Sequence, residues 1–293
     1  WPAARMRIVD GDTVRIDDLR IRIRAVDTEE VFRGDRLRAR AREDFVAYAA
    51  ERRGDATRPV KFPTPAGEAA RRAVEGLARE ATEVRLELDD LVDGPKDAFG
   101  RWLAHAVFVT PEGEIQLAEW LIREGHSPYY VKYGRSRRFD ARFRAAEAEA
   151  RAARRGIWGP GGPDHYPDYV ERTRWWRERA SQVDRWRAAP RREDRVTLGE
   201  REAADRLRAL VGREAEVFGS HGGSRDGNGP PWIHWLRGAP DEGFALVVFD
   251  PEVWAALPHE VIRTGYVVVR GPVTLYKGRP QVIVTSTEQV RIP

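Results

Sequence analysis

Apolar and charged residues alternate through residues 5–26, and this pattern constrains the start of the chain more than any other feature. Ile21 and Ile23 stand between arginines, and Asp17-Asp18 separates them from an earlier alternating run that ends at Ile16. A period of two places successive side chains on opposite faces of a β-strand. The sequence therefore predicts a hairpin with one apolar face and one polar face.

Glycine and proline mark the clearest boundary in the chain, at residues 159–163. A length of 293 residues also exceeds one average domain. We predict an N-terminal domain at 1–160, a helical linker at 161–197 and a C-terminal domain at 198–293. In the last of these, three expected strands, a short helix and two further strands follow one another, which is the element order of an OB-fold. The predicted fold class is mainly β with helices.

Composition excludes several classes of protein. An apolar content of 41% excludes global disorder, and the lack of cysteine excludes disulfides, thiolate zinc sites and cysteine nucleophiles. No run of eighteen apolar residues occurs, so no membrane span is expected. The net charge of +4, carried by 47 arginines and only four lysines, fits an acidic polymer as partner. Codon usage in a GC-rich genome explains the arginines equally well.

The first residue is Trp1 rather than methionine. We interpret this as the loss of a preceding segment such as a signal peptide. A secreted or periplasmic bacterial protein is expected on this basis, with a cytoplasmic one as the alternative.

Acidic residues flank the arginine-bearing strand on both sides. Asp12 precedes it, and Asp27 and Glu30 follow it. Carboxylates are hard oxygen ligands for a cation, and the planar guanidinium of Arg22 matches phosphate oxygens. This combination is typical of phosphodiester hydrolysis assisted by a metal. Asp10, by contrast, is expected to cap the Asp-Gly turn rather than bind the metal.

Several short motifs resemble the staphylococcal nuclease (thermonuclease) family over about residues 5–159. They are, in chain order, Asp10–Val14, Arg22–Glu30, Phe99–Arg101, the weaker Glu119–Gly125, and Gly156–Trp158. Several matches in the right order are stronger evidence than any single one.

The resemblance implies a five-stranded barrel with three helices and calcium-dependent cleavage of DNA and RNA. Asp12 and Asp27 stand at the positions of the metal-binding carboxylates, and Thr28 at that of a main-chain carbonyl ligand. Glu30 stands at the position of the usual candidate for general base. Arg22 and Arg101 stand at the positions of the two arginines that grip the scissile phosphate.

The sequence departs from the family pattern in three places. Thr28-Glu29-Glu30 replaces the usual Thr-Pro-Glu, so the turn that aims Glu30 is expected to be looser and Glu29 adds a competing carboxylate. Phe99 replaces a tyrosine that would bind a terminal phosphate. An insertion at about residues 32–65 follows the site directly, and we expect a lid, a substrate clamp or an oligomer contact.

Two further groups of residues could bind nucleic acid. Tyr130, Lys132 and Tyr133 follow the Glu119–Gly125 motif, and stacking on a base is weighed evenly against ordinary packing. In the C-terminal domain, residues 267–284 resemble bacterial nucleic-acid-binding OB-folds. The residues proposed for a stacking and phosphate-tracking face there are Trp232, Trp235, Tyr276, Lys277 and Arg279, with a structural or protein-binding barrel as the alternative.

The sequence thus predicts a calcium-dependent, sugar-nonspecific nuclease that hydrolyses DNA and/or RNA by in-line attack of water, with an OB-fold that captures substrate, preferably single-stranded. Two alternatives remain open. One is a nuclease-fold module that binds nucleic acid without cleaving it, and the other is a protein-interaction scaffold.

Overall fold

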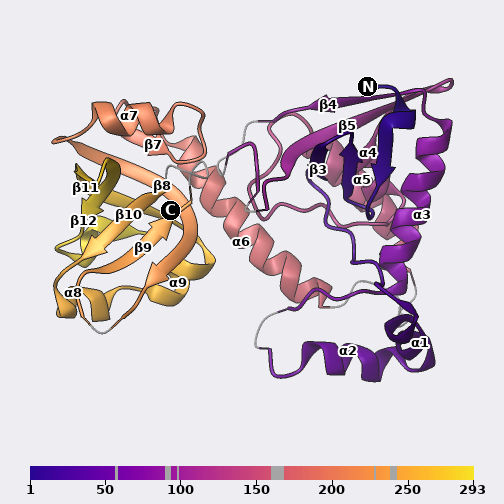
Figure 1. Cartoon of the computed structure of the whole chain (residues 1–293), viewed down its shortest axis with the longest axis horizontal. Coiled ribbons are helices and arrows are strands. Elements are labelled where there is room, and N and C mark those ends of the chain that lie inside the picture. Colours follow the sequence, from indigo (N-terminus) through magenta and orange to yellow (C-terminus); the bar gives the residue numbers. More distant parts are fainter. Residues whose placement is uncertain (57–58, 90–93, 98, 160–167, 228, 238–242) are drawn as a thin grey trace. The chain divides into compact units, whose positions relative to one another are not determined.

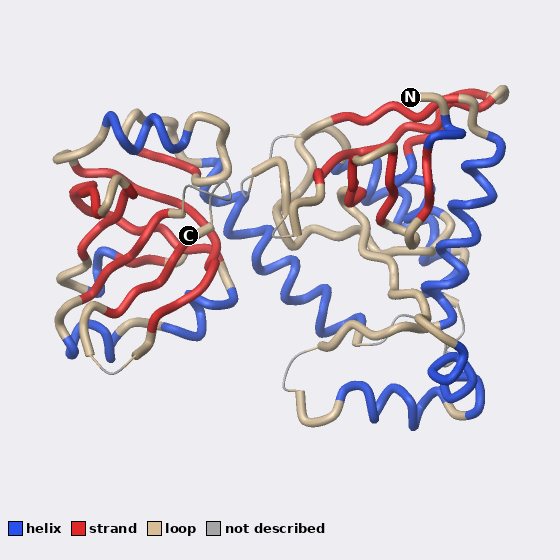
Figure 2. Tube along the Cα trace, viewed as in Figure 1, coloured by secondary structure: helices blue, strands red, loops and turns tan. Residues whose placement is uncertain are grey.

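The computed structural model describes residues 1–56, 59–89, 94–97, 99–159, 168–227, 229–237 and 243–293. The chain divides into two compact units. The first comprises Trp1–Asp90, Gly100–Val131 and Arg135–Trp176, and the second comprises Leu91–Phe99, Lys132–Gly134 and Arg177–Pro293. Most of the predicted boundary at 159–163 lies outside the described residues. Strands and helices of both units are coloured in Figure 2.

A curled sheet of six strands forms the centre of the first unit, so the predicted fold class of mainly β with helices is confirmed. Its strands are β1 (Met6–Ile8), β2 (Thr13–Ile16), β3 (Leu19–Ile23), β4 (Glu83–Glu87), β5 (Trp102–Thr110) and β6 (Gly113–Gln116). They follow the order β1-β2-β3-β5-β4, with β6 also paired to β5. The β3–β5 pair is parallel, and a bridge from Pro2 to Glu83 joins the N-terminal segment to β4. The sheet is thereby curled into a half-barrel.

The predicted hairpin is formed by β2 and β3, with Asp17-Asp18 at its turn. Val14, Ile16, Ile21 and Ile23 are buried, which is the apolar face that the alternation predicted.

Helices cover the first sheet. They are α3 (Pro65–Glu80), α4 (Leu117–Arg123) and α5 (Asp140–Ala152), and short 3-10 turns lie at Ala3–Arg5 and Gly156–Trp158. Thr64 caps α3 by accepting a hydrogen bond from the main chain of Gly67, and Pro65 stands at its first turn. Ala70, Val74 and Leu77 form the buried stripe of this helix.

The insertion folds into a helical hairpin with a small core of its own. It contains α1 (Asp35–Glu43) and α2 (Phe45–Arg53), and an extended segment then returns to the start of α3 (Figure 1). The core consists of Phe32, Ala41, Tyr48 and Phe62. The Tyr48 hydroxyl donates to the Pro63 carbonyl oxygen over 2.9 Å, so the hairpin is fastened to the returning segment.

The second unit is a closed five-stranded barrel with additional strands. The strands are β7 (Arg195–Thr197), β8 (Glu214–Arg225), β9 (Trp232–Leu236), β10 (Phe244–Val248), β11 (Tyr266–Tyr276), β12 (Arg279–Ile283) and β13 (Val290–Arg291). The order β8-β9-β10-β12-β11 closes because β11 also pairs with β8, and the β10–β12 pair is parallel. The strand order β1-β2-β3-β5-β4 of the first unit and the order β8-β9-β10-β12-β11 of the second are therefore equivalent.

The expected order of three strands, helix and two strands is present in the second unit, with two short helices instead of one. These are α8 (Pro251–Ala256) and α9 (His259–Thr264), and α7 (Ala203–Ala209) and a 3-10 turn at Thr287–Gln289 complete the unit. Strand β7 pairs with β8, so this sheet begins before residue 198. Helix α6 (Tyr169–Ala188) contributes residues to each unit, the first through Trp176 and the second from Arg177. Among the described residues, no helix has the length and apolarity to cross a membrane.

Candidate active site

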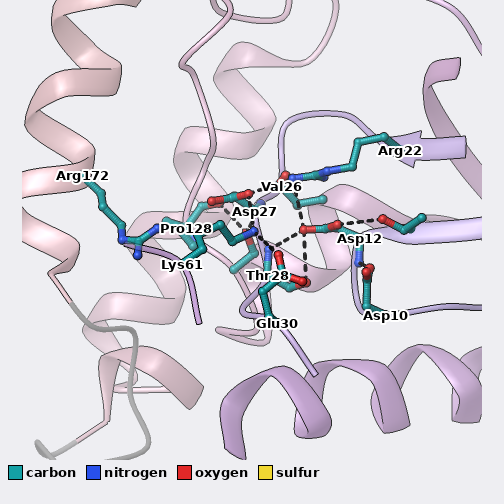
Figure 3. A network of polar contacts seen from close by, with 12 residues as sticks. Asp10, Asp12, Arg22, Val26, Asp27, Thr28, Glu30, Lys61, Pro128 and Arg172 are labelled. Carbon is teal, nitrogen blue, oxygen red and sulfur yellow. Dashed lines mark hydrogen bonds and ion pairs between the residues drawn. The ribbon is translucent and has the colours of Figure 1, made fainter. Parts of the chain in front are cut away.

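Three short segments of the first unit converge on one polar network (Figure 3). Residues 10–12 precede β2, Arg22 lies on β3, and residues 27–30 follow β3. The main-chain N–H of Ile23 donates to the carbonyl oxygen of Asp12 over 2.8 Å, which fixes the first two segments relative to each other.

The turn before β2 depends on a glycine. A Cβ atom at Gly11 would lie 2.7 Å from Cγ2 of Thr28 and 2.8 Å from Cβ of Ala70, so a larger residue would push the segments apart. The Asp10 carboxylate accepts a hydrogen bond from the main chain of Asp12 over 3.0 Å, which confirms the expected capping role. Burial raises the pKa of Asp10 to about 7, and the charge of Asp12 contributes to this increase.

The Asp12 carboxylate connects the three segments. Its Oδ2 atom accepts from the main-chain N–H of Thr28 over 2.8 Å and from the Thr28 hydroxyl over 3.2 Å. The same oxygen lies 3.1 Å from Nη2 of Arg22. Its Oδ1 atom accepts from the hydroxyl of Thr13 over 3.2 Å. Asp12 is only 4% exposed, so this carboxylate is held by partners rather than by solvent.

Arg22 binds both predicted metal-binding carboxylates. Its Nη2 atom donates to Oδ1 of Asp27 over 2.8 Å, and its Nη1 atom donates to the carbonyl oxygens of Ile23 and Val26, each over 2.8 Å. Burial lowers the pKa of the guanidinium, but Asp12 and Asp27 together raise it by more, so the pKa lies above its ordinary value. Both terminal nitrogens therefore already have acceptors within the protein.

The segment after β3 is positioned without the proline of the family pattern. A Cβ atom at Gly67 would lie 2.1 Å from the carbonyl oxygen of Glu30, so the start of α3 approaches this segment closely. The main chain of Thr64 also donates to that oxygen over 3.1 Å. Glu29 is buried at 4% exposure, whereas the Glu30 side chain is 42% exposed. Of the two glutamates, Glu30 is the one that is accessible to solvent, and it also contacts Lys61 of the network.

Lys61, from the insertion, is a member of this network that sequence reasoning missed. Its Nζ atom lies 3.0 Å from Oδ1 of Asp27 and 3.1 Å from Oε1 of Glu30 (Figure 3). Burial lowers the pKa of this ammonium, but the nearby carboxylates together raise it by more, so its pKa lies above the ordinary value. One signal was present, because lysine is rare in this chain and Lys61 stands among the prolines that end the insertion.

The other site residues that were predicted before residue 160 differ in their relation to the network. Arg101 reaches it through Thr13, whose hydroxyl accepts from Nη1 over 3.2 Å. The ring of Tyr130 lies 5.8 Å from the Arg22 guanidinium and packs edge-on against Trp176. Lys132 and Tyr133 group with the second unit instead.

The predicted stacking residues of the second barrel do not share one face. Trp232 and Trp235 are three positions apart on β9, so their side chains point to opposite faces. Trp232 stacks on Trp254 of α8, whereas Trp235 is 38% exposed. Tyr276 and Arg279 are directly paired across β11 and β12, and Lys277 lies in the turn between them with a positive φ of 52°.

The fit of a calcium ion can be judged from the donor atoms. Among the residues that the structure describes, no three His, Cys, Asp or Glu side chains are arranged to hold a metal ion. Asp12 and Asp27 nevertheless offer hard oxygens, and the Lys61 ammonium against Asp27 acts as a stand-in cation. The pair therefore fits calcium in donor type, provided that main-chain and water oxygens complete the shell and Lys61 leaves.

Comparison with known proteins supports part of the sequence interpretation. No curated protein matches the chain. A family model described as Staphylococcal nuclease homologue matches residues 20–160. The match begins after Asp12, and the folded hairpin brings this residue to Arg22, which also contacts Asp27. Such a domain indicates a nuclease or nucleic-acid-binding function. Over residues 20–160, the chain is therefore similar to the staphylococcal nuclease homologues.

Proposed function

We propose that the first unit is a calcium-dependent nuclease that hydrolyses phosphodiester bonds of DNA and/or RNA without regard to the sugar. The observation that carries this proposal is the network in which Asp12, Asp27 and Glu30 surround Arg22 and Lys61. Asp12 and Asp27 come from separate segments and are almost completely buried, and burial of two carboxylates side by side costs free energy. Such arrangements of ionisable groups concentrate at functional sites.

Each residue has a role in this proposal. Asp12, Asp27 and the main-chain carbonyl of Thr28 would hold calcium, which supplies charge neutralisation of the phosphate and a more acidic bound water. Glu30 has the solvent access that a general base needs to accept a proton from the attacking water. Arg101 stabilises the negative charge on the phosphate.

Arg22 has a double role. Its contacts to Asp12 and Asp27 hold the two carboxylates in place, and its charge adds to the field at the phosphate. The loss of Arg22 therefore affects the fold of the site as well as the reaction.

The second barrel would bind the substrate strand. Trp235, Tyr276 and Arg279 are the residues we assign to base stacking and phosphate contact, because Trp235 and Tyr276 are exposed and Arg279 pairs with Tyr276 across the strands. A preference for single strands follows from stacking, which needs unpaired bases.

A binding module without catalysis is the second candidate. It is favoured by one observation, namely that Arg22 and Lys61 already satisfy the carboxylates within the protein. Digestion of plasmid DNA and of RNA with calcium, and after chelation, tests the proposal. Cleavage that stops on chelation supports the nuclease, whereas binding without cleavage under every condition supports the second candidate. Cleavage that persists after chelation contradicts the calcium mechanism.

A further inference from the structure

The insertion places one lysine among the carboxylates of the candidate site. The Nζ atom of Lys61 contacts Asp27 and Glu30, which lie more than thirty residues earlier in the chain. The side chain of Asp27 is 7% exposed, so this contact differs from an ordinary ion pair on the surface. Exposed pairs contribute little to stability, whereas a charge beside a buried carboxylate strongly affects what else can bind there.

The segment that carries Lys61 is fixed on both sides. Before it, the carbonyl oxygen of Val60 accepts a hydrogen bond from Nη2 of Arg172 over 2.6 Å. After it, Pro63 bridges to Glu30 and accepts from the hydroxyl of Tyr48. Figure 3 shows Lys61 between Arg172 and the carboxylates. The placement of the ammonium is thus built by several contacts and does not depend on one flexible side chain.

A cation bound by Asp27 would meet the Lys61 ammonium at the same oxygen. Oδ1 of Asp27 already accepts from Arg22 and from Lys61, so a third positive partner would be repelled by two charges. Removal of Lys61 would leave the carboxylates of Asp27 and Glu30 with an excess of negative charge.

We propose that Lys61 is a tethered competitor of the divalent cation, and that it sets the calcium affinity of the site. Calcium binds only when the segment at residues 59–64 withdraws Lys61 from Asp27. This inference rests on the proposed nuclease function for the identity of the ion, but it concerns binding and not cleavage.

Calcium titration of the full-length protein by isothermal calorimetry tests this role. Lys61→Met, which keeps the chain length and removes the charge, should bind calcium at least about tenfold more tightly than the wild type. Lys61→Arg should stay close to the wild type. Lys96→Met is the matched control, because it removes an exposed lysine charge that belongs to the second unit and should leave the affinity unchanged. Adding Asp27→Asn to Lys61→Met should abolish the gain.

A second variant guards against a folding defect in Lys61→Met. Arg172→Met keeps Lys61 but removes the hydrogen bond that holds Val60, so calcium affinity should rise by a smaller factor. Hydrogen exchange in the wild type should also show the amide of Thr64, which donates to the carbonyl oxygen of Glu30, losing protection when calcium is added.

The outcomes separate this inference from the proposed function. Tighter calcium binding by Lys61→Met without cleavage by any variant supports the competitor role and contradicts the proposed nuclease function. Cleavage by the wild type, with equal or weaker calcium binding by Lys61→Met, overturns the competitor role but not the proposed nuclease function. No calcium binding by either protein overturns both.

Discussion

The guanidinium of Arg22 lies 2.8 Å from the carboxylate of Asp27, and both side chains are almost completely buried. The same nitrogen reaches Asp12 at 3.1 Å. One arginine on β3 therefore holds together a carboxylate that precedes β2 and another that follows β3. Replacement of Arg22 would take a positive partner from two buried carboxylates. The same is not expected for Arg101, so the two arginines should differ in their effect on stability.

Replacement of Arg22 should damage stability and activity together. We expect Arg22→Ala to lower the free energy of unfolding by about 3–5 kcal/mol, because it removes the positive partner of the buried Asp12 carboxylate and one of the positive partners of Asp27. Turnover should fall as well. Arg20→Ala, an exposed position on the same strand, should change stability by less than about 0.5 kcal/mol. Urea unfolding followed by tryptophan fluorescence measures the difference. Equal stability of the two variants would show that Arg22 does not stabilise the buried carboxylates.

Replacement of Arg101 should affect the reaction alone. This side chain donates a hydrogen bond to Thr13 and is partly exposed, so Arg101→Ala should leave the melting temperature close to the wild type. Turnover should fall by about a hundredfold or more, because a charge that stabilises the transition state is lost. Kinetics at saturating substrate and thermal denaturation are measured on the same sample. A large loss of melting temperature would assign Arg101 a structural role.

The two glutamates after β3 should respond differently to loss of charge. Glu30→Gln should lower turnover by about a hundredfold, because the proposed base is removed. Glu29→Gln should have a much smaller effect on turnover, since Glu29 is buried, whereas Glu30 is accessible to solvent and contacts Lys61. Turnover of both variants is measured under the same calcium concentration. If Glu29→Gln is the more damaging change, Glu29 is the working carboxylate.

The second barrel should lose stability as the pH falls. Burial, together with the nearby charges of His221 and His259, lowers the pKa of His234 to about 4, although Asp226 opposes this shift. As the pH falls, His234 is protonated near pH 6.5 in the unfolded chain but only near pH 4 in the folded chain. This stability is full above pH 6.5 and is lost between these values, by up to roughly 1.4 kcal/mol per pH unit.

Urea unfolding at several pH values, followed by tryptophan fluorescence, measures this loss. The slope against pH should decrease in His234→Gln, which cannot take up the proton. An unchanged slope in that variant would assign the acid sensitivity to other groups.

Binding of single strands should depend on the outer residues of the second barrel. Arg279→Ala should weaken binding to oligonucleotides of all sequences and flatten the salt dependence of log Kd by roughly 0.7, because one phosphate contact is lost. Arg270→Ala, an exposed control on β11, should leave both unchanged. Fluorescence anisotropy over a salt series measures the slopes. Identical slopes for both variants would favour a structural or protein-binding barrel.

Elements that depend on neighbouring residues are predictable from the sequence alone. The hairpin of β2 and β3 follows from alternation, and the turn at Asp10 follows from the short reach of an aspartate side chain. Helix α3 is likewise held by local features of the structure, namely the Thr64 cap, Pro65 in its first turn and a buried apolar stripe. In each case the interactions that fix the element lie within a few residues of it.

The residues that complete the site could be identified only in the folded chain. Lys61 reaches Asp27 only because the insertion folds on its own core and returns beside Glu30, and no local pattern encodes that path. Likewise, Trp232 and Trp235 are close in sequence, but the pleat of β9 and the position of α8 separate them into a packed and an exposed ring. Local elements and the acidic and arginine motifs could be predicted from the sequence, because they depend on neighbouring residues. The partners of those motifs depend on long-range packing, which only the folded chain provides.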